Sequence, residues 1–285
     1  MTEILKGYFL DTNVFNHLTP EQEESLENKG GDLEGGFTSR LVLTDLLITP
    51  SETELRVLAK RALVLCRGKI IKAWNELVQE ETRAFLKGAP LPTILYGDSE
   101  QREFQSVLER FAFGELPNAA KIAVFRQQQL VDRKRVKQWQ SALHEQHKLH
   151  LLEAAQELEF DQFWKQLWVP ELPKYIKKLL EMDNIEGDLD LAAAKLASNL
   201  GSLPCLEAFL KTPAALGYSE GKKRKPKRGD RDDIRLMACT ARLDTFVSDE
   251  PGLKNIFYWV FPQKQFLSLQ EFVDEFFQEP VQHSS

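Results

Sequence analysis

Residues 8–15, Tyr-Phe-Leu-Asp-Thr-Asn-Val-Phe, and residues 245–249, Thr-Phe-Val-Ser-Asp, decide the fold class of this chain. Each segment contains a short aromatic and aliphatic run that stops abruptly at polar residues. A run of this kind is typical of a strand that is buried in a parallel sheet and followed by a turn. Because the two strands lie near opposite ends of the chain, we predict an α/β core that is built from both ends.

Working outward from the first strand, we expect a helix over about residues 14–17 and a loop rich in Glu and Gly over residues 21–36. The run Leu-Leu-Ile-Thr at residues 46–49 predicts a second buried strand. Pro50 and Ser51 suit the start of a helix, and apolar residues continue at helical spacing to Val64.

For the middle of the chain, the sequence pattern predicts mostly helix, as in residues 70–85, 122–150 and 151–168. In the last of these, apolar residues recur three or four positions apart, which indicates one buried face. No low-complexity linker interrupts this region. We therefore expect the helical part to pack onto the α/β part.

Near the C-terminus the α/β pattern returns. We expect a helix over residues 233–243, strands over residues 245–248 and 256–261, and a closing amphipathic helix over residues 268–277. The two ends of the chain are thus predicted to be α/β, and the middle all-α.

The composition is that of an ordinary globular protein, with 42% hydrophobic and 28% charged residues among 285. No apolar run approaches the roughly 20 residues of a membrane helix, and the N-terminus does not resemble a secretion signal. The cysteines, Cys66, Cys205 and Cys239, are odd in number and far apart, which argues against a disulfide framework or a zinc cluster. We expect a reduced, cytoplasmic protein. Gly-rich phosphate loops, Gly-x-Ser-x-Gly elbows and Cys/His nucleophile pairs are absent from the sequence.

Charge is sorted along the chain rather than spread evenly, although the net charge is −6. Residues 221–231 carry seven basic side chains against one acid, and residues 126–137 form a second basic stretch. The first run directly precedes an acidic group, so it is a candidate contact for a nucleic-acid backbone; the alternative is a solvated loop. The candidate contacts are Lys222, Lys223, Arg224, Lys225, Lys227, Arg228 and Arg231.

Carboxylates follow the predicted strands at several places. Asp11 follows the first strand, Glu54 opens the helix after the second, and Asp249 follows the strand at residues 245–248. Asp230 and Asp233, three residues apart, begin a further helix and can share one side of it. Since carboxyl ends of parallel strands share an edge, these acids are expected to converge, and hard oxygen ligands suit Mg²⁺ or Mn²⁺. Taken singly, each acid also fits a turn or an N-cap.

These segments resemble the PIN domain, a metal-dependent nuclease family that includes toxin ribonucleases and RNA-processing enzymes. The resemblance lies in residues 8–15, in Ile-Thr-Pro-Ser-Glu-Thr-Glu-Leu (48–55), in Gly-Asp-Arg-Asp-Asp-Ile-Arg-Leu-Met-Ala (229–238) and in residues 243–253. The closing Phe-Leu-Ser-Leu-Gln-Glu-Phe (266–272) also fits. Ser248 stands where the family often has Thr, which keeps the hydroxyl.

The resemblance implies a three-layer domain with a central parallel sheet. Residues 1–58 and 221–285 would form its discontinuous core, and the helical residues 59–220 would partly complete that core and partly form an insertion. It also implies a catalytic set of Asp11, Glu54, Asp230, Asp233 and Asp249, with Glu52 as an alternative to Glu54. The metal ligands would be Asp11, Asp249 and one or both of Asp230 and Asp233, supported by Asn13 and Ser248.

The expected activity is hydrolysis of RNA phosphodiester bonds by a Mg²⁺- or Mn²⁺-dependent endoribonuclease, since one or two such ions activate a water and stabilise the leaving oxygen. Two alternatives stay open: an inactive PIN-fold adaptor that binds RNA or protein, and a nuclease that acts on DNA structures. Besides an RNA substrate, the resemblance to toxins leaves open a cognate inhibitor protein and a homo-oligomer. No membrane partner is expected.

Overall fold

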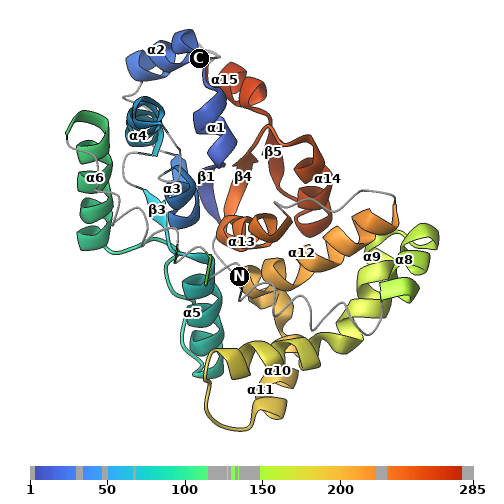
Figure 1. Ribbon diagram of the computed structural model, residues 1–285. Coiled ribbons are helices and arrows are strands. Elements are labelled where there is room, and N and C mark those ends of the chain that lie inside the picture. The colour runs from blue at the N-terminus through green and yellow to red at the C-terminus, as the bar shows by residue number, and fades with distance from the viewer. Residues whose placement is uncertain are drawn as a thin grey trace, which may run out of the picture.

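Five short parallel strands form the sheet at the centre of the molecule. In the computed structural model they are β1 (Leu5–Leu10), β2 (Gly36–Ser39), β3 (Ile70–Ile71), β4 (Leu243–Val247) and β5 (Gln265–Leu267). Their order is β3-β2-β1-β4-β5, and every pairing is parallel (Figure 1). The predicted α/β class with a parallel sheet is confirmed. The structure describes residues 4–29, 35–46, 51–66, 69–114, 127, 130–131, 134, 148–222 and 230–277.

The central strand β1 pairs with β2 on one side and with β4 on the other. Phe9 is level with Phe37 and Phe246, and Leu10 is level with Val247. Because all strands point the same way, their last residues define one edge of the sheet, here called the carboxyl edge. Their first residues define the opposite edge, here called the amino edge.

One group of helices packs beside β2: α1 (Thr12–His17), α3 (Arg40–Leu46) and α4 (Glu52–Cys66) contact one another, and α4 also contacts β2. Against α4 lie α2 (Pro20–Lys29) and α6 (Asp98–Phe113). The last turn of α4 lies next to the start of β2, since a Cβ at Gly36 would be 1.9 Å from the Leu65 carbonyl oxygen. The first turn of α4 is therefore the end nearer the carboxyl edge.

A second group packs around α12 (Pro204–Gly221), which contacts α5 (Trp74–Leu86), α13 (Asp230–Thr240) and α14 (Pro251–Val260). Of these, α13 contacts β4 and α14 contacts β5, while α15 (Leu269–Phe277) follows β5 directly. This group joins residues from the middle of the chain to residues from its C-terminal end.

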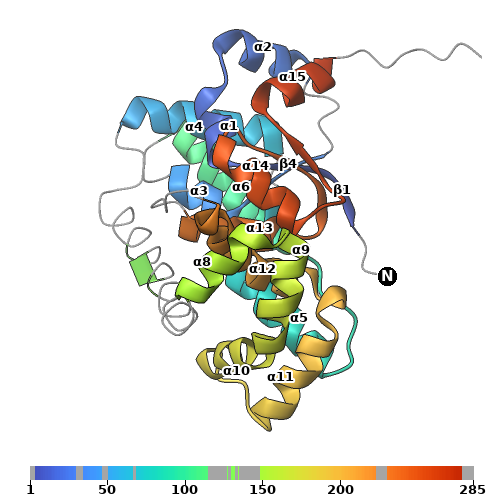
Figure 2. The same ribbon diagram turned by 90° about the vertical axis from the view of Figure 1, so that its right-hand side faces the viewer.

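The remaining helices extend from α12. They are α8 (Lys148–Glu157), α9 (Phe160–Phe163), a π-helical turn (Trp164–Trp168), 3-10 turns (Val169–Glu171 and Leu200–Ser202), α10 (Leu172–Met182) and α11 (Leu189–Ser198). Helices α10 and α11 pack on each other. Figures 1 and 2 both place them at the end of the molecule that is farthest from α2 and α15.

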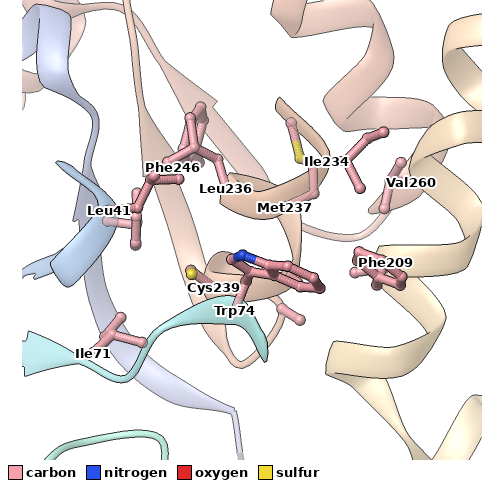
Figure 3. Packing of buried hydrophobic residues seen from close by; sticks show 14 of the residues in the cluster. Leu41, Ile71, Trp74, Phe209, Ile234, Leu236, Met237, Cys239, Phe246 and Val260 are labelled. Carbon is pink, nitrogen blue, oxygen red and sulfur yellow. The ribbon is translucent and has the colours of Figure 1, made fainter. Parts of the chain in front are cut away.

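The sheet and the helical part share one hydrophobic core, as Figure 3 shows. Trp74, in the first turn of α5, stacks on Phe209 of α12 with ring centroids 4.9 Å apart. The same cluster includes Leu41 of α3, Met237 of α13 and Phe246 of β4. The helical part is therefore integral to the core that supports the sheet.

The second strand of the structure is not the predicted one. Residue 46 ends α3, residues 47–49 lie outside the described residues, and β2 instead occupies Gly36–Ser39. Its pattern is hard to detect because Phe37 is its only large apolar residue. Thr38 and Ser39 are nevertheless fully buried. Hydrogen bonds satisfy their hydroxyls: Thr38 donates to the Leu10 carbonyl (3.4 Å), and Ser39 Oγ accepts from the Val42 N–H (3.3 Å).

The predicted loop over residues 21–36 is wrong over residues 21–29, which belong to α2, whereas residues 30–34 lie outside the described residues. Thr19 and Gln22 make a reciprocal capping box, with the Gln22 N–H on Thr19 Oγ1 (3.3 Å) and the Thr19 N–H on Gln22 Oε1 (2.9 Å). Glu23 then anchors the helix to Arg61 of α4 at 2.9 Å. Capping and this ion pair stabilise a helix that has little apolar surface.

The predicted strand over residues 256–261 lies in α14, which ends at Val260. Pro251 occupies the first turn, and Leu253, Ile256, Phe257 and Val260 form one buried face at helical spacing. A short apolar run does not distinguish a buried helix from a strand, and the actual last strand is β5. The predicted helix over residues 70–85 similarly begins with the strand β3, and α5 starts at Trp74.

Other helix predictions shift at their ends. Residues 151–168 divide into α8, α9 and the π-helical turn, and the helix predicted over residues 233–243 runs from Asp230 to Thr240. Most of residues 122–150 lie outside the described residues. Within the described residues, no helix is long and apolar enough to cross a membrane. Cys66, Cys205 and Cys239 are buried as free thiols.

Candidate functional site

Asp11 is the first residue beyond β1 and lies at the carboxyl edge. It caps α1: its backbone is extended, and its Oδ1 accepts the Thr12 N–H at 2.6 Å. Asp is among the preferred residues at this position because its carboxylate satisfies an amide that the helix leaves unpaired. The side chain is nonetheless 5% exposed, so this carboxylate is held almost entirely within the protein.

Ser248, the first residue beyond β4, connects Asp11 to the other end of the chain. Its hydroxyl donates to Asp11 Oδ2 at 2.8 Å and accepts from Asn13 Nδ2 at 3.0 Å and from the Glu250 N–H at 3.2 Å. Asn13 Oδ1 in turn accepts the Asp249 N–H at 3.2 Å. We call Asp11, Asn13, Ser248 and Asp249 the edge network; all four were predicted as site residues, and the structure brings them together.

The Asp249 carboxylate connects the edge network to two further elements. Oδ1 accepts the Leu269 N–H of α15 at 2.8 Å, and Oδ2 lies 3.4 Å from Nδ1 of His17 on α1. The Asp249 side chain keeps 28% of its surface exposed, in contrast to the buried Asp11. The network therefore has one buried carboxylate and one that solvent reaches.

Glu54 lies in the first turn of α4, where Ser51 Oγ accepts its N–H at 3.1 Å. Its side chain is exposed, and the orientation of α4 places this turn toward the carboxyl edge. Glu52, the alternative acid, pairs with Arg56 one turn along the helix at 3.0 Å. Of the two acids, only Glu52 makes this ion pair with Arg56; Glu54 does not.

The acids of α13 divide into two kinds. Asp232 pairs with the fully buried Arg235 one turn along the helix. Asp233 is 4% exposed, in the first turn of α13. Asp230 begins the helix, but its side chain lies outside the described residues. Since α13 ends beside the amino edge, its first turn is the end that is farther from that edge.

The donor set of the edge network fits a hard cation. Carboxylate oxygens are the ligands that Mg²⁺ and Mn²⁺ prefer, and protein Mg²⁺ sites often use one or two carboxylates and leave other positions to water and phosphate. A carboxylate oxygen that accepts one hydrogen bond keeps a lone pair for a cation. Among the side chains that the structure describes, however, no three His, Cys, Asp or Glu residues gather as a metal-binding group.

Most of the predicted basic contact surface lies outside the described residues, namely Lys223, Arg224, Lys225, Lys227 and Arg228; Arg231 is in α13, but its side chain is not described. Lys222 directly follows α12 and is exposed. Its ammonium lies 5.4 Å from the centre of the Tyr218 ring and 3.4 Å from the Gln156 carbonyl oxygen.

Two residues near the edge network were missed by the sequence analysis. Ser39 ends β2 at a level with the other strand ends and caps α3. Its signal was a serine followed by an apolar helical run, a standard helix start. His17 contacts Asp249 although the two residues are 232 positions apart, and nothing in the sequence pairs them.

Comparison with known proteins adds no relative: the chain matches no protein-family model, no curated protein and no solved structure.

Proposed function

We propose that this protein has a PIN-like core and acts as a metal-dependent endoribonuclease at the carboxyl edge of its sheet. The observation that supports this most is the edge network, which links Asp11 to Asp249 through Ser248 and Asn13. A strand-end carboxylate that only terminates a turn needs no second carboxylate from the far end of the chain. RNA as the substrate rests on the motif resemblance.

In this proposal each residue of the edge network has a distinct role. Asp11 and Asp249 hold the cation, Ser248 fixes the orientation of the Asp11 carboxylate, and Asn13 fixes the backbone of Asp249. To bind a cation through both oxygens, Asp249 would exchange its contact with His17, the longest one in the site at 3.4 Å. Glu54, Asp230 and Asp233 would add carboxylates from α4 and α13.

A bound Mg²⁺ or Mn²⁺ would supply Lewis acidity that activates water and offsets the charge of a phosphodiester. The chain itself contributes rigidity, because the Asp11 carboxylate is buried and held by donors from two elements. Positioning of this kind is worth a large part of a phosphoryl-transfer barrier. The basic run that links α12 to α13 would hold the substrate backbone through its phosphates.

The test compares Asp11→Asn with the wild-type protein on single-stranded RNA and on DNA of the same sequence, with Mn²⁺ and with EDTA. Asn keeps the helix cap and the shape of the side chain, so we expect a folded protein whose RNA cleavage falls at least about a hundredfold. EDTA should abolish cleavage by the wild type. Asp98→Asn, an exposed acid in the first turn of α6, is the matched control and should cleave normally.

Unchanged cleavage by Asp11→Asn would contradict the proposed mechanism, and preferential cleavage of DNA would shift the substrate class. A second candidate, the inactive adaptor, is favoured by one observation: both carboxylates of the edge network already accept protein donors. It predicts that the wild type binds RNA or a protein partner and does not cut RNA with any divalent cation.

A further inference from the structure

A cavity of about 380 Å³ lies at the amino edge, where α12 passes the start of β4. One stripe of α12 lines it, with Pro204, Glu207, Ala208 and Lys211 at helical spacing. The opposite wall comes from the first residues of β4 and from the segment between α14 and β5. A cavity of this size falls in the range of small-molecule sites.

The cavity combines apolar walls with three basic and two acidic side chains. Val260, Phe261 and Pro262 supply apolar surface on one side. Lys211, Arg242 and Lys264 line it together with only two carboxylates, Glu207 and Asp244. Burial raises the pKa of Glu207 and lowers the pKa of Lys264 to about 7, so desolvation disfavours the charged form of one acid and of one base.

Lys264 and Asp244 are each held by hydrogen bonds to the backbone. Lys264 donates to the carbonyls of Thr240 (3.1 Å) and Ala241 (2.5 Å) at the C-terminal end of α13, and its ammonium lies 4.2 Å from the centre of the Phe261 ring. Asp244 Oδ1 accepts the Gly7 N–H at 2.9 Å. Both contacts hold the fold together and account for these side chains.

Lys211 and Arg242 are different, because both are buried and both keep unused donors. Lys211 is 9% exposed, and its nearest acid within the described residues, Glu207, is 4.0 Å away, too far for a hydrogen bond. Arg242 is also 9% exposed; one of its terminal nitrogens donates to the Pro92 carbonyl at 2.5 Å, whereas its buried Nε has no acceptor within the described part of the chain. Within the described residues, the Lys211 ammonium makes no hydrogen bond, and Arg242 has a second terminal nitrogen without a hydrogen bond beside the one that donates to Pro92. Unused donors on two cationic side chains of one cavity favour an anionic acceptor from outside the chain.

We propose that this cavity binds a small organic anion, a carboxylate or phosphate monoester with a compact apolar body. The anionic group would accept from Lys211 and Arg242, and the apolar body would lie against Val260 and Phe261. The site lies at the opposite edge of the sheet from the edge network, so it is independent of the proposed nuclease activity.

The test uses the full chain and matched pairs of probes in ligand-observed NMR and calorimetry: benzoate with benzamide, hexanoate with hexanamide, and phenyl phosphate with phenol. We expect at least one anion to bind about tenfold or more tightly than its neutral partner, as charge-assisted hydrogen bonds imply. Comparing benzoate with phenyl phosphate identifies which anion the site prefers.

Substitutions at three positions, Lys211, Lys178 and Ala208, locate the binding. Lys211→Met removes the charge and should weaken anion binding about tenfold or more, whereas Lys211→Arg should retain it. Lys178→Met, an exposed lysine on α10, is the control and should bind as the wild type does. If Lys211→Met fails to fold, Ala208→Leu, which fills the cavity from α12, should block binding instead.

The proposal is overturned if no anion binds, if neutral and anionic partners bind equally, or if a folded Lys211→Met or Ala208→Leu variant binds anions as tightly as the wild type.

Discussion

The two edges of the same sheet handle polar groups in opposite ways. At the carboxyl edge, Asp11, Ser248 and Asp249 hydrogen-bond to one another or to nearby backbone, and Asp249 is still reached by solvent. At the amino edge, α12 passes beside the start of β4, and ionisable groups are buried there. Polar side chains at the carboxyl edge are therefore stabilised mainly by hydrogen bonds, whereas desolvation has the larger effect on ionisable side chains at the amino edge.

Glu81 shows what burial does at the amino edge. It is 2% exposed and accepts the Leu206 N–H at 2.8 Å, which stabilises the start of α12. Burial raises its pKa to about 7, against the hydrogen bonds and the Arg242 charge that lower it. Burial likewise lowers the pKa of Lys264 to about 7. The comparison indicates that the pH dependence of the free energy of unfolding arises mainly at the amino edge. The candidate catalytic carboxylates lie at the carboxyl edge.

The largest expected effect is at the start of β2. A Cβ at Gly36 would be 1.9 Å from the Leu65 carbonyl oxygen, a backbone atom that cannot move without displacing α4. We expect Gly36→Ala to lower the free energy of unfolding by about 3 kcal/mol or more, as overpacking does in its severe cases. Urea-induced unfolding measures this.

Gly217→Ala is the matched control, because a Cβ there has no neighbour within 4 Å and the position is inside α12. It should stabilise the protein by up to about 1 kcal/mol through helix propensity. Equal free energies of unfolding for the two variants would contradict the inference that close backbone packing at the amino edge stabilises the protein.

The next effect is a pH dependence that Glu81 and Lys264 impose. Between pH 4.5 and 7 the folded state binds more protons than the unfolded chain at Glu81, so stability falls as pH rises. Between pH 7 and 10.5 the folded state binds fewer protons at Lys264, so stability rises with pH. The Glu81 contribution should amount to about 2–3 kcal/mol across its window.

Urea unfolding at a series of pH values checks this, with Glu81→Gln keeping an oxygen for the Leu206 N–H. The variant should lose the decline between pH 4.5 and 7. Glu103→Gln, an exposed acid on α6, should leave the decline in place. A Glu81→Gln profile that matches the wild type would show that desolvation does not dominate at this edge.

The smallest effects are expected in the edge network. Ser248→Ala removes one donor and leaves Asn13 and the Glu250 N–H without their acceptor, so we expect a loss of about 1–2 kcal/mol. His17→Ala, its neighbour at the same edge, should cost less than about 0.5 kcal/mol, because its contact with Asp249 is long and exposed. Thermal unfolding of both variants would measure the difference, and a larger cost for His17→Ala would reverse the order of importance assigned here.

Local patterns predicted the strands that carry the edge network and failed for those that do not. β1 and β4 are apolar runs that end in polar residues, so both their existence and the residues beyond them could be identified. β2 has one large apolar residue, and β5 is short and follows an apolar helix that resembled a strand. Their positions depend on pairing with β1 and β4, which no local window contains.

By itself, the sequence determined the α/β class and identified the polar residues that follow β1 and β4. This was possible because a buried strand and the polar residues after it form a pattern of a few adjacent side chains. Only the tertiary structure decided that Ser248 joins Asp11, that His17 meets Asp249, and that Lys211 and Arg242 share a cavity. The physical reason is that hydrogen bonds and desolvation depend on distance in space. Parallel pairing of β1 with β4 brings together the partners of the first two contacts, which the sequence separates by more than two hundred positions, and the packing of α12 beside the start of β4 brings Lys211 and Arg242 to one cavity.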